Sequence, residues 1–129
     1  MPVRVVCAVI TNGNRIFAAQ RGPRVQQALK WEFPGGKVEP GETLEECLRR
    51  ELSEELQMQV NIIEKLPSVF YRYPYFSIEL IPFLCSAENQ RFFPVEHLGA
   101  GWFEPYKLRE LPWAEADLKV LDLVLRKIN

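Results

Sequence analysis

The stretch from Trp31 to Gln57 changes character abruptly at Thr43, and this junction constrains the fold more than any other part of the chain. Residues 31–42 read WEFPGGKVEPGE, and their density of glycine and proline excludes a helix and predicts a structured loop. From Thr43 the pattern is helical, because Thr43 is a favoured N-cap and Glu46, three residues later, completes a capping box. A rigid loop must therefore run directly into a helix over 43–57.

Segments rich in β-branched and aromatic residues lie on both sides of this junction. The first, Val3 to Ile10, is followed by the turn signal Thr11-Asn12-Gly13-Asn14 and a second such segment, which predicts a hairpin. We expect strands at 3–10, 15–20, 58–73, 75–85 and 101–103, and an amphipathic helix at 116–128 with Leu118, Leu121, Val124, Leu125 and Ile128 on its apolar face. Strands interleaved with two helices predict an α/β fold, a mixed sheet sandwiched between helices.

The whole chain of 129 residues is expected to form one domain, since it contains no linker, repeat or low-complexity tract. A hydrophobic content of 47% with 26% charged residues is typical of soluble globular proteins. Three cysteines, Cys7, Cys47 and Cys85, form no close pair, so we expect buried, reduced thiols and a cytoplasmic location. The apolar N-terminal stretch is too short for a membrane span, so we expect no membrane partner.

The charge is nearly balanced overall and strongly uneven along the chain. The net charge of −1 argues against a protein that coats duplex nucleic acid or an anionic membrane. Residues 1–31 hold five bases and no acid, whereas residues 32–55 hold eight acids and three bases, a local net charge of −5. Such a distribution suits a divalent-cation site and a small phosphorylated substrate.

Two glutamates lie on the side of the predicted helix that should be buried. At about 100° per residue, Glu51 and Glu55 fall within the sector of the apolar residues, and Glu54 falls at its edge. Three crowded carboxylates are costly unless their pKa values rise, arginines pair with them, or a cation binds. Oxygen ligands at this density suit Mg²⁺ or Mn²⁺. The alternative is a solvated acidic helix face.

The same residues form a pattern that resembles the signature of the Nudix hydrolases, G-x5-E-x7-R-E-U-x-E-E-x-G-U, where U is aliphatic. Gly36 is followed by five residues and Glu42, then by seven residues and Arg50-Glu51-Leu52-Ser53-Glu54-Glu55-Leu56-Gln57-Met58. The flanking residues 31–37 resemble the MutT-like branch, whose members hydrolyse nucleoside triphosphates. The final glycine of the signature is replaced by Gln57, which would cost about 1 kcal/mol in a left-handed conformation, unless the helix ends in another way.

The resemblance implies roles for the residues that match. Glu51, Glu54, Glu55 and the backbone carbonyl of Gly36 would be magnesium ligands, Arg50 would orient a glutamate, and Glu42 would be structural or an outer ligand. A further glutamate in a loop after the long strands assists with metal or acts as base in this branch. Glu96 is the candidate here, and Glu54 is the alternative.

Substrate contacts are also implied by the resemblance. Arg21 is similar in placement to a phosphate-contacting arginine, and Lys37 could serve too, although each could be an ordinary surface base. Asp117 lies where a polar residue reads the base, and it could instead be the N-cap of the last helix. Phe33, Phe70 and Tyr73 could stack on a base or belong to the core. His97 is expected at the surface.

The resemblance therefore implies Mg²⁺-dependent hydrolysis of a nucleoside triphosphate to the monophosphate and pyrophosphate. A carboxylate at Asp117 fits an oxidised guanine or a cytosine, so the leading substrate is 8-oxo-dGTP, which would make the protein an enzyme of nucleotide-pool sanitation. The first alternative is (d)CTP or a modified cytidine nucleotide. The second is a non-catalytic nucleotide-binding module, which retention of all signature glutamates argues against. The oligomeric state, monomer or homodimer, stays open.

Overall fold

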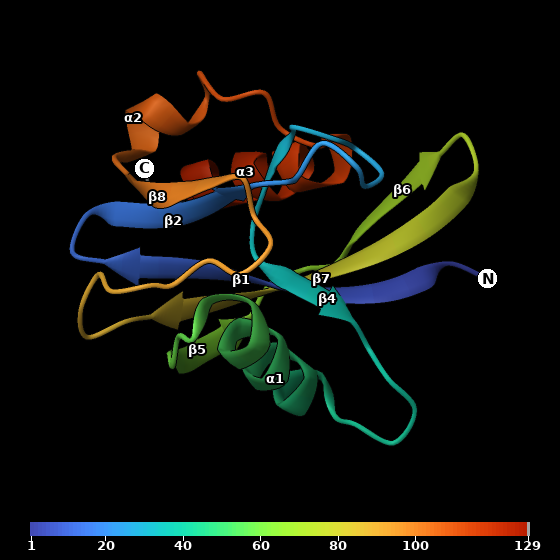
Figure 1. Cartoon of the computed structure of the whole chain (residues 1–129), viewed down its shortest axis with the longest axis horizontal. Helices are drawn as coiled ribbons and strands as arrows, with labels where there is room; N and C mark the ends of the chain where they lie inside the picture. Colours follow the sequence, from blue (N-terminus) through green and yellow to red (C-terminus); the bar gives the residue numbers. More distant parts are fainter. Residues whose placement is uncertain (129) are drawn as a thin grey trace.

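A computed structural model describes residues 1–128 of the protein, so Asn129, the last residue of the predicted domain, lies outside it. In chain order the elements are β1 (Val3–Asn12), β2 (Arg15–Gln20), β3 (Trp31–Glu32), β4 (Gly35–Lys37), α1 (Leu44–Leu56), β5 (Asn61–Lys65), β6 (Val69–Tyr73), β7 (Phe76–Ser86), β8 (Gly99–Phe103), α2 (Pro105–Leu108) and α3 (Glu115–Ile128) (Figure 1).

The strands form one mixed sheet built around the parallel pair β1 and β7. Their register runs from Val3 opposite Ile78 to Thr11 opposite Ser86. The strand order is β3-β2-β1-β7-β5, and β4, β6 and β8 pair with β1, β7 and β2 respectively. All pairings other than β1 with β7 are antiparallel. The predicted α/β class with a mixed sheet is confirmed.

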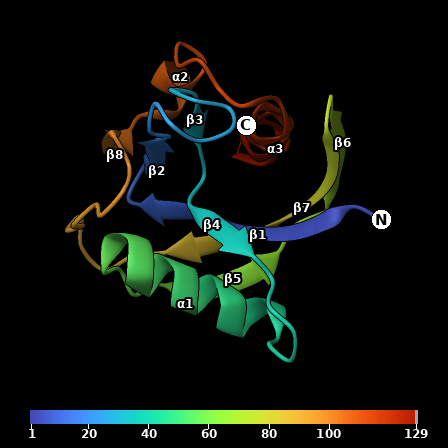
Figure 2. The same cartoon turned by 45° about the vertical axis from the view of Figure 1, so that its right-hand side comes forward.

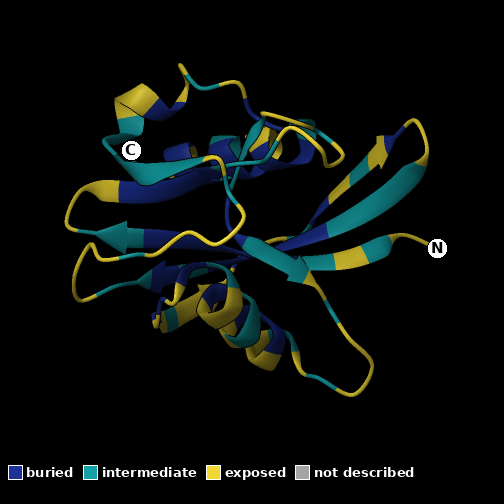
Figure 3. Ribbon diagram, in the orientation of Figure 1, coloured by how far each residue is buried: buried dark blue, intermediate teal, exposed yellow. Residues whose placement is uncertain are grey.

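Helices α1 and α3 cover opposite faces of this sheet, and Figure 2 shows α3 nearly end-on above the strands with α1 below them. Successive side chains of a strand point to opposite faces, and β1 follows this rule. Cys7 and Val9 join the core beneath α3, whereas Val6 and Ala8 join the core beneath α1. Burial accordingly concentrates in the central strands, and the outer side of α1 is exposed (Figure 3).

Several predicted boundaries differ from the structure, because pairing partners decide them. The strand predicted over 58–73 is two strands, β5 and β6, which pair with different halves of β7, and Pro67 lies in the break. The loop over 31–42 contains the short strands β3 and β4. Strand β8 begins earlier than predicted, and α2 was not predicted.

The last helix begins at Glu115, where the N–H of Leu118 bonds to the carbonyl of Ala114 at 2.9 Å. Its buried face holds Val120, Leu121, Val124 and Leu125, but Leu118 is 40% exposed, so its predicted burial is wrong.

Helix α1 ends at Gln57 in the left-handed conformation expected of the signature glycine. Gln57 has φ 53° and ψ 39°. Its N–H bonds to the carbonyl of Ser53 at 3.1 Å, and the N–H of Met58 bonds to that of Leu52 at 3.2 Å. The carbonyls of Leu52 and Ser53 therefore have hydrogen-bond donors. The cost is the strain of holding a residue with a Cβ, Gln57, in the left-handed region.

All three cysteines are free and buried, as expected. Between residues 1 and 128, no helix combines the length and the apolar character needed to cross a membrane.

Candidate active site

The loop over 38–43 delivers the chain into α1 through a complete capping box. The N–H of Glu46 donates to Thr43 Oγ1 at 3.1 Å, and the N–H of Thr43 donates to Glu46 Oε1 at 2.8 Å. Both predicted halves of the box are present. This fixed start sets the direction in which the glutamates of the following turns project.

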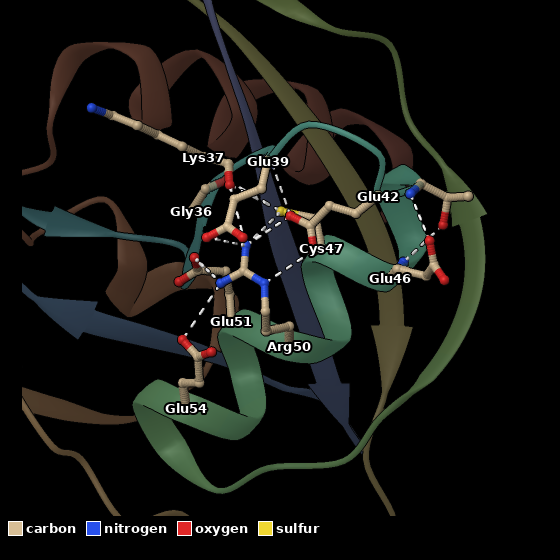
Figure 4. A network of polar contacts seen from close by, with 10 residues as sticks. Gly36, Lys37, Glu39, Glu42, Glu46, Cys47, Arg50, Glu51 and Glu54 are labelled. Atoms are coloured by element: carbon tan, nitrogen blue, oxygen red, sulfur yellow. Dashed lines mark hydrogen bonds and ion pairs between the residues drawn. The ribbon is translucent and has the colours of Figure 1, made fainter.

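Arg50 lies at the centre of a carboxylate network beside β4 (Figure 4). Its Nε and Nη2 donate to the two oxygens of Glu42 at 3.0 and 2.7 Å, a bidentate pair. Its Nη1 donates to Glu51 Oε1 at 2.9 Å and to Glu54 Oε2 at 3.4 Å. The hydrogen bond from Arg50 lowers the pKa of Glu42 to about 2, so Glu42 is charged at neutral pH and pairs with this arginine.

Gly36 lies directly against Glu51. A Cβ at Gly36 would overlap the Glu51 carboxyl group, so only glycine allows the carboxylate to lie over the β4 backbone. Burial raises the pKa of Glu51, and the bond to Arg50 opposes this. Gly35 is similarly constrained, because a Cβ there would overlap the backbone of Val6 on β1.

The three signature glutamates of α1 have three different surroundings. Glu51 is paired with Arg50, and Glu54 is 61% exposed at the rim. Glu55 is half-buried, and its Oε1 is buried without a hydrogen-bond partner among the described residues. Burial raises the pKa of Glu55 to about 8, although the nearby His97 opposes the shift.

This donor set fits a hard divalent cation. Among the described residues, the buried Oε1 of Glu55 has no hydrogen-bond partner, and the glycine at position 36 brings its own backbone and the Glu51 carboxylate together. Carboxylate and carbonyl oxygens are the ligands that Mg²⁺ and Mn²⁺ prefer. Within the described part of the chain, no three acidic, histidine or cysteine groups already converge as a metal site, consistent with the engagement of Glu51 and Glu54 by Arg50.

A cleft of ≈ 370 Å³ opens beside this network. It is lined from β1, β4, the 21–27 loop, the β6–β7 hairpin and the start of α3, and the lining includes Arg21, Phe33, Gly36, Lys37 and Asp117. Arg21 and Asp117, which are 96 positions apart in sequence, therefore line the same cavity. Its size suits a small molecule.

The two basic residues that line the cleft, Arg21 and Lys37, differ in how firmly contacts hold their side chains. Arg21 Nη1 donates to Glu32 Oε1 at 2.6 Å and its Nε donates to the Gln26 carbonyl at 2.8 Å, so its guanidinium is held in place. Lys37 has an exposed side chain at the end of β4. Both residues line the cleft.

Asp117 is not the N-cap of α3, because it lies inside the first turn. It is 8% exposed, and its Oδ2 accepts a hydrogen bond from the Phe33 N–H at 3.0 Å. Burial raises the pKa of Asp117 well above its ordinary value, and the charge of Glu32 acts in the same direction. A buried carboxylate facing a cleft is typical of a recognition residue rather than a helix cap.

The aromatic candidates separate into core and surface. Phe33 is 2% exposed, and its ring packs against Trp113 at 4.8 Å, so it forms part of the cleft floor. Tyr73 is 4% exposed, and its hydroxyl accepts from the Ala116 N–H at 3.0 Å. Phe70 is 65% exposed and lies outside the cleft lining.

The sequence did not reveal the environment of His97 and Glu32. The prediction that His97 lies at the surface is wrong, since its side chain is 6% exposed and its Nε2 lies 2.9 Å from Glu32 Oε2. Residues 91–98 form neither a helix nor a strand, so no hydrophobic periodicity in the sequence indicates that His97 is buried. Glu96, next to His97, is exposed.

Comparison with known proteins agrees with this geometry. The NUDIX domain family matches residues 1–124. A CTP pyrophosphohydrolase of Escherichia coli K12 is 33% identical over 120 residues, covering 93% of this chain and 89% of that protein. An 8-oxo-dGTP diphosphatase of Haemophilus influenzae is 29% identical over 128 residues, covering 98% and 94%.

The fold agrees as well. The solution structure of the E. coli ORF135 protein superposes with a TM-score of 0.79 at 33% identity, covering 96% of this chain and 90% of that one. A family match over nearly the whole chain, on a fold whose helix α1 carries the signature residues Glu51, Glu54 and Glu55, establishes membership: this chain belongs to the Nudix hydrolase family.

Proposed function

We propose that this Nudix hydrolase converts a nucleoside triphosphate to the monophosphate and pyrophosphate with the help of Mg²⁺, and that 8-oxo-dGTP is its leading substrate. The observation that carries the proposal is the cleft, which joins the Gly36 edge of the carboxylate network to the buried Asp117. Phosphates and base would thus lie in one cavity. The name of the H. influenzae relative supports this substrate.

The carboxylate network would hold the cation through the Gly36 carbonyl, Glu51, Glu54 and Glu55. When bound, a divalent cation neutralises phosphate charge and makes a water molecule more acidic. The protein supplies the positioning: Arg50 fixes Glu51 and Glu54 through Nη1, and Glu42 fixes Arg50. Pre-positioned charge of this kind accounts for most of the catalysis in phosphoryl transfer.

The bond changes follow the resemblance to the MutT-like branch. Water attacks the β-phosphorus, the bond from that phosphorus to the oxygen bridging to the α-phosphorus breaks, and the nucleoside monophosphate leaves. The water proton passes to a carboxylate, either Glu54 on α1 or Glu96 on the 91–98 segment. Arg21 and Lys37 would contact the phosphates from the rim of the cleft.

Asp117 would read the base. Its Oδ2 accepts from the Phe33 N–H, which leaves Oδ1 to accept from an exocyclic amino group. Guanine, cytosine and adenine derivatives offer such a group, and thymine does not. A second candidate substrate is therefore (d)CTP or a modified cytidine nucleotide, favoured by the E. coli relative named CTP pyrophosphohydrolase.

The test is a panel of standard and oxidised (d)NTPs with Mg²⁺, assayed for pyrophosphate release. We expect the highest kcat/KM for 8-oxo-dGTP, and a preference for CTP or dCTP would select the second candidate. Tight nucleotide binding without pyrophosphate release would instead identify a non-catalytic module. We propose a small-molecule partner and a cytoplasmic location, which the three buried free thiols support.

A further inference from the structure

We propose that His97 is a positioning residue that holds the 91–98 segment, and with it Glu96, against α1 through its hydrogen bond to Glu32. The inference rests on the proposed function, because it assigns His97 a part in the same reaction. It concerns a residue outside the Nudix signature, and its role follows from contacts between three segments that are distant in sequence.

Glu32 joins two segments that flank the site. Its Oε1 accepts from Arg21 Nη1 at 2.6 Å, and its Oε2 pairs with His97 Nε2 at 2.9 Å. All three side chains are largely removed from solvent, with exposed fractions of 29%, 15% and 6% for Arg21, Glu32 and His97. One carboxylate on β3 therefore ties the end of β2 to the segment before β8.

The 91–98 segment runs along the C-terminal end of α1. The N–H groups of Phe93 and Val95 donate to the carbonyls of Leu56 and Glu55 at 2.9 and 3.0 Å, and the N–H of Leu98 donates to Gln20 at 3.0 Å. These bonds satisfy carbonyls that a helix end leaves free. Glu96 lies between these anchors, one residue from the backbone that contacts Glu55.

His97 is the side chain that turns inward from this segment. Val95 and Leu98 are each 61% exposed, and Glu96 is exposed, whereas the imidazole is buried. Its Nδ1 is buried and has no partner among the described residues. The bond to Glu32 is therefore the polar anchor of this ring, and its loss would leave both ring nitrogens unpaired in a buried place.

Two amide variants distinguish the hydrogen bond of His97 to Glu32 from a role of the ring in packing alone. In His97→Gln the amide nitrogen lies close to the position of Nε2, so it can keep the bond to Glu32. In His97→Asn the shorter side chain places the amide nitrogen near the position of Nδ1, so the bond to Glu32 is lost. Leu98→Ala is the matched control, since it changes an exposed neighbour and leaves the backbone bond to Gln20 intact.

We expect His97→Asn to lower kcat by about 10- to 100-fold, the range seen for outer-shell partners of metal sites, with little change in KM for the nucleotide. His97→Gln and Leu98→Ala should stay close to the wild type. Because the anchor acts through Glu96, His97→Asn should lower kcat no further in a Glu96→Gln background. Amide hydrogen exchange over 93–98 should rise in His97→Asn and remain slow in His97→Gln.

The inference is overturned if His97→Asn keeps wild-type kcat, if it lowers kcat equally with and without Glu96, or if exchange over 93–98 is unchanged. Failure of the proposed function looks different, because wild-type protein would then release no pyrophosphate from any nucleotide. In that case the exchange measurement still decides whether His97 anchors the segment.

Discussion

At the scale of single residues, the site is defined by what each carboxylate contacts. Arg50 engages Glu42, Glu51 and Glu54, whereas Glu55 keeps a buried oxygen without a partner among the described residues. Asp117 is buried in the cleft that Gly36 also lines, and its Oδ2 accepts a hydrogen bond from the Phe33 N–H. Side chains of the same type thus have very different surroundings, and these surroundings underlie the structural, metal-binding and recognition roles proposed above.

Glu54→Gln should abolish turnover while leaving the melting temperature unchanged or slightly raised. Glu54 is 61% exposed, and its contact with Arg50 is long at 3.4 Å, so the folded state loses little when the charge is removed. Glu45→Gln, an exposed residue in the first turn of α1, is the control and should keep full activity. A clear fall in melting temperature with turnover intact would support the solvated-face interpretation.

Asp117→Asn should raise the melting temperature near pH 7. The expected gain is about 4 °C for each kcal/mol by which removal of the buried charge raises the free energy of unfolding. The amide retains an oxygen for the Phe33 N–H and removes a buried charge. Because the pKa of Asp117 in the folded state lies above its ordinary 3.8, wild-type stability gains as pH falls through the folded pKa towards that value. The difference in melting temperature between the two proteins should therefore shrink in acid.

The same variant also tests recognition. It should raise KM for the preferred nucleotide far more than for the other three bases, because an amide presents both a donor and an acceptor. Equal loss across all bases together with a lower melting temperature would mean that Asp117 only supports the fold.

At the scale of elements, capping residues and hydrophobic periodicity correctly predict the elements that depend on neighbouring residues in the sequence. The β1–β2 hairpin, the capping box of α1 and the body of α3 agree with the sequence pattern. The division of 58–73 into β5 and β6 could not be predicted, because it depends on pairing with β7. The two strands pair with different halves of β7. The burial of His97 and Asp117 depends on segments far away in sequence, so no local pattern carries it.

Gln57→Gly should stabilise the protein by about 1 kcal/mol in urea unfolding, with activity unchanged. The gain comes from removing a side chain at a left-handed position, φ 53°. Gln59→Gly is the matched control, since Gln59 has no positive φ and should lose stability through the greater freedom of its unfolded chain. Loss of stability in both variants would contradict the cost assigned to Gln57.

The β6–β7 hairpin contributes an exposed aromatic to the cleft. Tyr75 lines the cavity and is 93% exposed, whereas Phe70 on the same hairpin is 65% exposed and outside the lining. Tyr75→Ala should raise KM about fivefold or more with little effect on kcat, since a base stacked on an aromatic gains about 1–3 kcal/mol. Phe70→Ala should leave both constants unchanged, and an equal effect of the two variants would exclude stacking on Tyr75.

At the scale of the whole molecule, part of the uneven charge of the chain comes together beside one cleft. The sheet brings the acidic α1 beside the cleft whose rim holds Arg21, from the base-only first 31 residues. The near-zero net charge conceals this arrangement. A protein that attracts a cation and a triphosphate together needs both signs of charge close to each other rather than an excess of one.

Mg²⁺ alone should therefore stabilise the whole fold. A cation that binds only the folded state adds about 2.7 kcal/mol at 100 times its Kd, which a melting curve can detect. NaCl at equal ionic strength is the control and should have a much smaller effect. Glu55→Gln should reduce the Mg²⁺ response and keep the NaCl response, and an unchanged response to Mg²⁺ would place the cation elsewhere.

The parallel pairing of β1 with β7 also sets when the protein can begin to work. Val3 meets Ile78, so the centre of the sheet cannot close until more than half of the chain has left the ribosome. Asp117 arrives later still, with the last helix. Helix α1 is synthesised before β7 and α3, so a nascent chain lacks part of the cleft lining until synthesis is almost finished.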